Sequence, residues 1–391
     1  MRRQAFVYPT KINEMTMKST ETVLPGYGVE NAGSNKEDAI IYDMIVFCHL
    51  RWGFVYQRPQ HLITRLAKSK KILLIEEPIP YGENEYATAN FIEAEPNITI
   101  MQSRVNHIHE IAQVIEKYIP NKQVKVGWFY SPAFSSLISS FKFEKVVYDC
   151  MDELSLFKGA SAELVAQEKF LMSKADIVFT GGKSLYESKM HHHKNVHCFA
   201  SSVERPHFEK ALNGIPIPED IAGLKKPVIG YYGVIDERIN LGLIADVADK
   251  NPTSSFVMIG PLAKIREEDL PKRSNIHYIG MRGYNVLPNY LKGFDIAMMP
   301  FALNESTRFI SPTKTLEYMA AGKPIISTPI KDVLRDYGHC VAIVDTADEF
   351  SEAIGDITTY GSEEQISQFE TILDNTSWDT TAAKMEELLN N

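Results

Sequence analysis

The stretch MMPFALNESTRFISPTKTLEYMAAGKPIISTPI, residues 298–330, decides the fold because it holds a strand, a loop, a helix and a second strand in succession. The first apolar run ends at Pro300. Pro312 then marks the first turn of a helix, and Ser311 is placed to cap it. Small residues at 320–322 end the helix before the apolar run after Lys323. This order predicts a crossover between parallel strands of an α/β sheet.

The expected start of this helix is suited to bind phosphate. The first backbone N–H groups of a helix have no partners inside it, and the helix dipole attracts anions. Lys314 adds a positive charge. Glu317 lies one turn further on the same face, where its carboxylate could accept hydrogen bonds from a ribose diol. A simple cap with an ion pair between Lys314 and Glu317 would give the same pattern, so both interpretations stay open at this point.

Short apolar runs alternate with helix-like segments both before and after this stretch. DMIVFCHL and KILLIEEP begin the series, and PVIGYYGVI restarts it after a connection rich in proline and glycine. The alternation predicts two Rossmann-like halves. We expect a polar arm (1–40), a first domain (41–206), a linker (207–226), a second domain (227–375) and a C-terminal helix that crosses back (376–391).

Composition excludes several classes of protein. The chain has 391 residues, 44% of them hydrophobic and 23% charged, so a mostly disordered chain is excluded. A net charge of −9 argues against a nucleic-acid-binding protein. We find no apolar run of about 18 residues and no signal peptide, which predicts a cytoplasmic protein. The four cysteines are far apart, which predicts free thiols.

Charge is divided unevenly along the chain. Residues 41–205 carry 19 basic and 18 acidic side chains, whereas residues 206–391 carry 17 and 27. The segment 49–71 contains six Lys or Arg residues and no Asp or Glu, so it is locally basic. It is either a solvated helix face or a site for an anionic ligand or membrane surface.

The chain resembles the GT-B glycosyltransferases of the bacterial group 1/group 4 type, which build surface polysaccharides, over about residues 44–390. The motif P-x-K-x-x-E-Y-M-A-x-G-K-P-x-I, from Pro312 to Ile326, carries the resemblance. It implies an α/β GT-B fold, with two Rossmann-like domains whose parallel sheets face a central cleft. By this resemblance Glu317 holds the ribose of a nucleotide-sugar donor, and the amides near Ser311, Thr313 and Lys314 hold its diphosphate.

The resemblance implies further residues on the donor side. It places Gly233 in a tight turn at the phosphates and Gly260 at a strand end that faces the nucleotide. Arg282 and Tyr284 belong to the stretch that reads the base. The expected catalytic residues are Arg238 and Lys314, as the two positive charges, and Asp152, since Met151 stands where many relatives have a histidine. No metal and no cofactor is expected.

The segment WGFVYQRPQH resembles an entry to the first helix in a subgroup of these enzymes. It implies acceptor binding by Trp52, Arg58, Gln60 and His61. The expected acceptor is a glycan or an isoprenoid-diphosphate-linked oligosaccharide, with peripheral contact at the inner face of the cell membrane.

The sequence also departs from the family. A second carboxylate is usual at the position of Phe309. Retention at the anomeric carbon is implied by the resemblance, and inversion with Asp152 or His61 as the base stays open. Two alternatives share the fold: a nucleotide-sugar epimerase, and a non-catalytic nucleotide-sugar-binding partner of another transferase.

Overall fold

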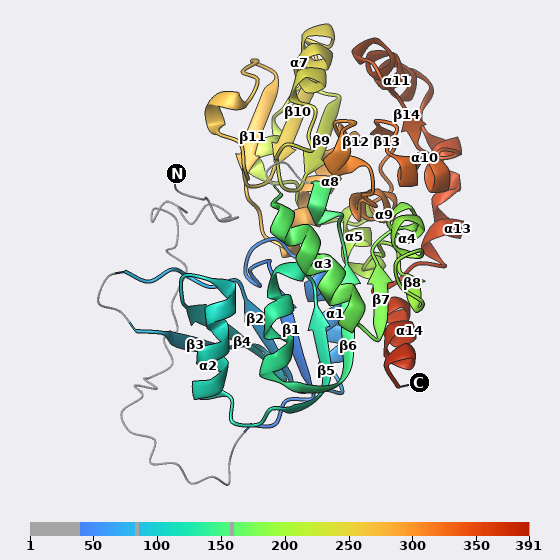
Figure 1. Ribbon diagram of the computed structural model, residues 1–391. Coiled ribbons are helices and arrows are strands. Elements are labelled where there is room, and N and C mark those ends of the chain that lie inside the picture. The colour runs from blue at the N-terminus through green and yellow to red at the C-terminus, as the bar shows by residue number, and fades with distance from the viewer. Residues whose placement is uncertain (1–39, 83–85, 157–159, 391) are drawn as a thin grey trace.

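The computed structural model describes residues 40–82, 86–156 and 160–390. It contains two β-sheets, one in each of two α/β domains. The first domain lies below the second in Figure 1. The predicted fold class, two Rossmann-like domains with parallel sheets, is confirmed. The expected arm at 1–40 lies outside the described residues except for Ile40.

The first sheet has eight strands in the order β3-β4-β2-β1-β5-β6-β7-β8. All neighbours are parallel except β3 and β4. Strands β1 and β2 are buried along their whole length because helices cover both faces. The strands are β1 (Met44–Cys48), β2 (Ile72–Glu76), β3 (Thr88–Glu95), β4 (Ile98–Arg104), β5 (Gln123–Phe129), β6 (Lys142–Cys150), β7 (Ile177–Thr180) and β8 (Val196–Cys198).

The helices of the first domain include short 3-10 turns at the strand ends that border the second domain. They are α1 (Arg58–Leu66), η1 (Ile108–Glu110), α2 (Ile111–Tyr118), η2 (Pro132–Ser140), η3 (Leu154–Leu156), α3 (Ala162–Lys174) and α4 (Lys183–Lys189).

The second sheet has six parallel strands in the order β11-β10-β9-β12-β13-β14. This is the 3-2-1-4-5-6 order of the nucleotide-binding folds, with its switch point between β9 and β12. The strands are β9 (Val228–Tyr232), β10 (Ser255–Ile259), β11 (Ile276–Gly280), β12 (Ile296–Met299), β13 (Ile325–Ser327) and β14 (Ala342–Ile343).

Helices pack on both faces of the second sheet, as Figure 1 shows. They are α5 (Arg205–Phe208), η4 (Glu209–Leu212), α6 (Glu219–Ala222), α7 (Leu241–Lys250), η5 (Glu267–Asp269), η6 (Tyr284–Val286), α8 (Leu287–Gly293), η7 (Glu305–Thr307), α9 (Lys314–Ala320), α10 (Lys331–Tyr337), α11 (Ala347–Tyr360), α12 (Glu363–Ser367) and α13 (Phe369–Leu373). None of the helices in the described ranges is long and apolar enough to cross a membrane.

The segment 207–226 is not the open linker that its proline and glycine content predicts. Phe208, Ala211 and Ile221 are buried in the core of the second domain. These apolar residues fix the segment to the second domain. The chain therefore crosses from the first domain to the second earlier, between β8 and α5.

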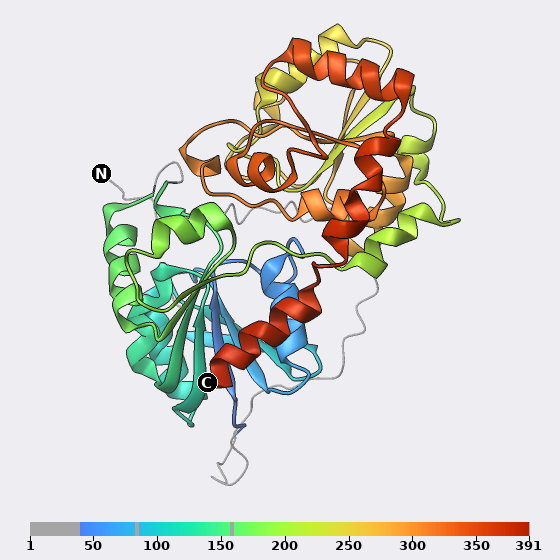
Figure 2. The same ribbon diagram turned by 90° about the vertical axis from the view of Figure 1, so that its right-hand side faces the viewer.

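The C-terminal helix α14 (Trp378–Asn390) lies against the first domain, on helix α1 (Figure 2). Its buried residues Trp378 and Met385 belong to the core of that domain. The basic run contributes to this contact. Arg65 and Lys68 lie 3.1 and 3.4 Å from the carboxylate of Asp379, and Lys70 pairs with Glu386.

The part of the basic run 49–71 that faces α14 is therefore neither simply solvated nor free for an outside anion. Its cations hold the acidic helix that returns from the second domain. Sequence could not show this pairing because the partners are more than 300 residues apart.

Candidate active site

A cleft of about 1320 Å³ lies between the two domains. The first domain lines it with residues that follow β1, β2, β4 and β6, and the second with residues that follow β9, β10 and β12 and with the start of α9. The carboxyl ends of both parallel sheets thus face one space, which is where open α/β sheets bind ligands.

Glu317 projects into this cleft from helix α9. It is only 6% exposed, and the hydroxyl of Tyr232 at the end of β9 donates a 2.5 Å hydrogen bond to its Oε2. Burial raises the pKa of Glu317, while the bond from Tyr232 and the charge of Lys314 oppose that rise. The carboxylate is therefore held in a fixed orientation at the second-domain wall.

Lys314 lies directly over the turn at Gly233. A side chain at Gly233 would place its Cβ 2.2 Å from Lys314 Cε, and Gly233 has a φ of +140° that favours glycine. The ammonium Nζ lies 5.6 Å from the centre of the Tyr231 ring. It makes no ion pair or hydrogen bond with any described residue. Burial lowers the pKa of Lys314, and Glu317 opposes that effect.

Arg238 and Asp152 line the same cleft from opposite domains. Arg238 pairs with Asp236, with Nη2 and Oδ2 2.7 Å apart. Burial raises the pKa of Asp152, and the charge of Arg238 opposes this. The three expected catalytic side chains, Arg238, Lys314 and Asp152, are thus brought together, while their roles stay predictions.

The start of α9 differs from the expectation. Ser311 does not cap the helix: the N-cap is Thr313, without a side-chain cap bond. The carbonyl of Ser311 instead accepts a 2.5 Å hydrogen bond from Ser201 Oγ of the interdomain crossing. The amide of Thr315 already bonds to the carbonyl of Pro312 at 3.3 Å. Ser311, Thr313 and Lys314 still line the cleft.

Two expected donor residues do not line the cleft. Gly260 has a φ of +150°, and a Cβ there would lie 1.8 Å from the carbonyl oxygen of Gly233, so it supports the Gly233 turn from behind. The Arg282 guanidinium bonds to Asp220 at 3.1 Å and to the Tyr290 hydroxyl at 2.7 Å. Those partners keep Arg282 from the direct contact that was expected.

Tyr284 does line the cleft, and other aromatic rings hold it. It stacks on His207 with ring centres 4.2 Å apart and on Tyr56 of the first domain at 4.5 Å. Its hydroxyl donates to Glu204 at 3.2 Å. This stack joins the domains at the cleft.

Most of the residues that WGFVYQRPQH implies for acceptor binding instead make contacts within the first domain. Arg58 lines the cleft, but its guanidinium pairs with buried Asp149 at 2.9 Å. Gln60 donates to the carbonyl of Trp52 at 3.0 Å. Of these residues, Trp52 and Gln60 do not line the cleft. The motif instead fixes the loop before α1.

His61 is also wrong as an acceptor contact or a base. It is 1% exposed and stacks on Trp378 of α14, with ring centres 4.8 Å apart. Burial lowers its pKa to about 3, and Arg65 adds to the effect. The reason for the error is that α14 covers this face of α1, a long-range contact that a local motif does not reveal.

Phe309, where the family usually has a second carboxylate, packs against the apolar core of the first domain. Met151 lines the cleft. The side chain of Phe309 therefore makes an apolar contact between the domains.

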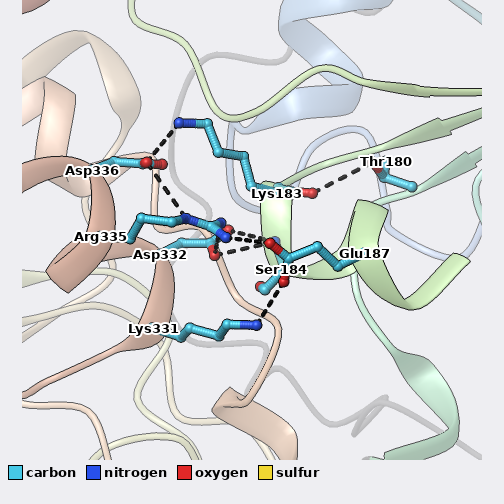
Figure 3. Close-up of polar contacts among 9 residues, drawn as sticks. Thr180, Lys183, Ser184, Glu187, Lys331, Asp332, Arg335 and Asp336 are labelled. Carbon is cyan, nitrogen blue, oxygen red and sulfur yellow. Dashed lines mark hydrogen bonds and ion pairs between the residues drawn. The ribbon is translucent and has the colours of Figure 1, made fainter. Parts of the chain in front are cut away.

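Polar residues of α4 and α10 hold the domains together beside the cleft (Figure 3). Asp332 accepts hydrogen bonds from the backbone amide of Ser184. Around this contact, Lys183 pairs with Asp336, and Glu187 pairs with both Lys331 and Arg335, each at 2.6 Å.

Two side chains on the first-domain wall of the cleft, His49 and Glu77, are not among the site residues that the motifs predict. Each directly follows a fully buried strand, β1 or β2. That position was the available signal, because polar residues just after parallel strands meet at the carboxyl edge of the sheet.

Part of the second half of the chain is similar to a known family. Residues 226–359 match the family model described as glycosyl transferases group 1. The chain is 24% identical over 239 residues to TuaH of Bacillus subtilis (strain 168), provisionally named a teichuronic acid biosynthesis glycosyltransferase. That match covers 56% of this chain and 60% of TuaH, less than two thirds of the relative.

Solved structures share the fold over nearly the whole chain. Sucrose-phosphate synthase from Thermosynechococcus elongatus has a TM-score of 0.66 and 13% identity, over 89% of this chain and 98% of its own. A trehalose-6-phosphate structure from E. coli bound with UDP-2-fluoro glucose has a TM-score of 0.66 and 12% identity, over 88% and 98%. HepE of Anabaena, in complex with UDP and glucose, has a TM-score of 0.63 and 12% identity, over 90% and 100%.

Two Rossmann-like domains around a cleft lined by both sheets define the GT-B class. The chain therefore has the GT-B fold, and its residues 226–359 are similar to the group 1 glycosyl transferases.

Proposed function

We propose that this protein transfers a sugar from a nucleoside diphosphate sugar to an acceptor bound in the cleft. The observation that carries the proposal is the placement of Glu317 and Lys314 on the cleft wall, inside the segment that matches the family model. Structural neighbours bound to UDP or to a UDP-sugar analogue support UDP as the nucleotide.

The geometry suggests a role for each donor-side group. Glu317, oriented by Tyr232, is suited to accept hydrogen bonds from the two ribose hydroxyls. The Gly233 turn lets backbone come close to the diphosphate, with Lys314 above it. Lys314 and Arg238 would stabilise the negative charge that develops on the leaving nucleoside diphosphate. Side-chain cations in this position support a reaction without a metal.

The proposal extends to the stereochemistry, the biological role and the acceptor. Retention of configuration follows from the resemblance. A role in cell-surface polysaccharide synthesis is supported by the similarity to TuaH. A lipid-linked acceptor would bring the protein to the inner face of the cell membrane, whereas a soluble glycan would not.

Calorimetric titration with UDP tests the donor site. We expect wild-type protein to bind UDP, and Lys314→Ala and Glu317→Gln to bind it at least about tenfold more weakly, since each removes a charged contact. Lys272→Ala, at an exposed position of the second domain, is the matched control. Unchanged affinity in the correctly folded Lys314 and Glu317 variants would contradict the site assignment.

Donor consumption then separates the possible reactions. A transferase consumes a UDP-sugar faster when an acceptor is added, whereas an epimerase converts it without one. A non-catalytic binding partner consumes none in either case. Repeating the assay with a chelator tests the proposed independence from metals.

A further inference from the structure

His49 and Glu77 form a pair on the first-domain wall of the cleft. Strands β1 and β2 are parallel, and their last paired residues are Cys48 and Glu76. His49 and Glu77 are the next residues of the two strands, so they emerge next to each other at the carboxyl edge of the sheet. Both line the cleft.

The Glu77 carboxylate has no hydrogen-bond partner among the residues that the structure describes. Its neighbour Arg51 is engaged elsewhere: it donates to the Glu76 carboxylate at 3.1 Å and to the backbone carbonyls of Glu77 and Pro78 at 2.5 and 3.3 Å. Burial raises the pKa of Glu77 to about 7, and the charge of Arg51 only partly opposes this. The Glu77 carboxylate is thus a half-buried hydrogen-bond acceptor at the cleft wall whose capacity no described side chain uses.

His49 also has a ring nitrogen without a hydrogen-bond partner among the described residues. This atom is the buried Nδ1. Burial lowers its pKa to about 4, and the charge of Lys264 across the cleft adds to the effect. The neutral ring offers one donor and one acceptor.

The surrounding charges limit what these two groups can bind. Arg51 and Lys264 disfavour a cation beside Glu77, and the carboxylate disfavours a phosphate. A neutral hydroxyl both donates and accepts, so it satisfies a carboxylate and a neutral imidazole together. Ile79 and Ile108 lie on the same wall and offer apolar surface to the face of a sugar ring.

We propose that His49 and Glu77 form the subsite that binds a sugar hydroxyl of the acceptor. Glu77 accepts a hydrogen bond from that hydroxyl, and His49 bonds to the same or a neighbouring one. The inference rests on the proposed transferase function and assigns the acceptor a carbohydrate moiety at this wall. The donor-side groups Lys314 and Glu317 lie on the second-domain wall, so the acceptor hydroxyl would face the donor across the cleft.

Ligand-observed NMR by saturation transfer tests the subsite with the whole protein at saturating UDP. The probes are the methyl β-glycosides of glucose, galactose and N-acetylglucosamine. We expect saturation transfer from wild-type protein to at least one of them, with affinity about fivefold lower in Glu77→Gln and in His49→Ala, because each loses a hydrogen bond.

Glu144→Gln is the matched control, because Glu144 is exposed near the opposite, amino-terminal end of β6. It should bind the glycoside like the wild type, and all four proteins should bind UDP equally. If no glycoside binds to wild-type protein, or if both variants bind it as well as the wild type, the subsite is wrong, while intact UDP binding leaves the proposed function standing. Failure of wild-type protein to bind UDP would contradict the proposed function itself.

Discussion

The carboxylate of Asp332 in helix α10 accepts hydrogen bonds from the backbone amide of Ser184 in helix α4, with its two oxygens 3.2 and 3.3 Å from that nitrogen. Asp332 belongs to the second domain, is 2% exposed and also pairs with Arg335 at 2.6 Å. One buried carboxylate therefore accepts a hydrogen bond from the first turn of a first-domain helix and joins the two domains (Figure 3).

Asp332→Ala should loosen this contact between the domains. It leaves the Ser184 amide without its carboxylate partner, which costs about 1–3 kcal/mol for a buried group. We expect a lower melting temperature and a larger radius of gyration by small-angle scattering. Asp348→Ala, at an exposed position of α11, should change neither quantity. A variant as compact and stable as the wild type would show that the contact does not hold the domains.

Gly260→Ala should disrupt the donor site although residue 260 does not line the cleft. A Cβ there would lie 1.8 Å from the Gly233 carbonyl oxygen, so the turn beneath Lys314 must move. We expect UDP affinity to fall at least about tenfold in calorimetry. Gly214→Ala is the control, because its Cβ meets nothing within 4 Å. Equal affinities would contradict the supporting role of Gly260.

Glu77→Gln should change how stability depends on pH. A folded-state pKa of about 7, against an ordinary value of 4.5, means that ionising Glu77 destabilises the fold as pH rises through that interval. The charge of Arg51 acts on Glu77 directly, Glu76 precedes it in β2, and His49 follows the neighbouring strand β1. The variant should match the wild type near pH 4.5.

At pH 8 the Gln variant should be more stable by roughly 1–2 kcal/mol, since Glu77 keeps some contact with solvent. Urea denaturation at the two pH values measures the difference. A constant difference between pH 4.5 and pH 8 would show that the carboxyl titrates normally.

Trp378→Ala should destabilise the first domain although Trp378 lies near the C-terminus. The ring is fully buried and stacks on His61, so its removal leaves a cavity that costs about 3–5 kcal/mol. Urea denaturation followed by circular dichroism checks this. Leu388→Ala, at a half-buried position of the same helix, should cost distinctly less. Equal losses in the two variants would argue against a specific role for the Trp378–His61 stack.

Local patterns predicted the two α/β halves and the helix at α9. These depend on alternating apolar runs, on proline and glycine positions and on a long family motif, all of which are contained within short stretches of chain. Glu317, Lys314, Arg238, Asp152, Gly233 and Tyr284, which these patterns indicate, all line the cleft, and their roles stay predictions. The errors lie where a local motif faces a distant partner, as for Arg282 with Asp220 and His61 with Trp378.

The sequence by itself determined the order of strands and helices and the identity of the polar groups at the strand ends. The tertiary structure alone decided which of those groups are paired with another side chain and which stay available to bind a ligand. Arg58 and Arg65 are both basic residues of one helix, yet a buried aspartate holds the first and the returning helix α14 holds the second. Glu77 and Lys314 are left without such partners among the described residues, because pairing depends on which distant carboxylates and cations the packed domains bring within a few ångströms.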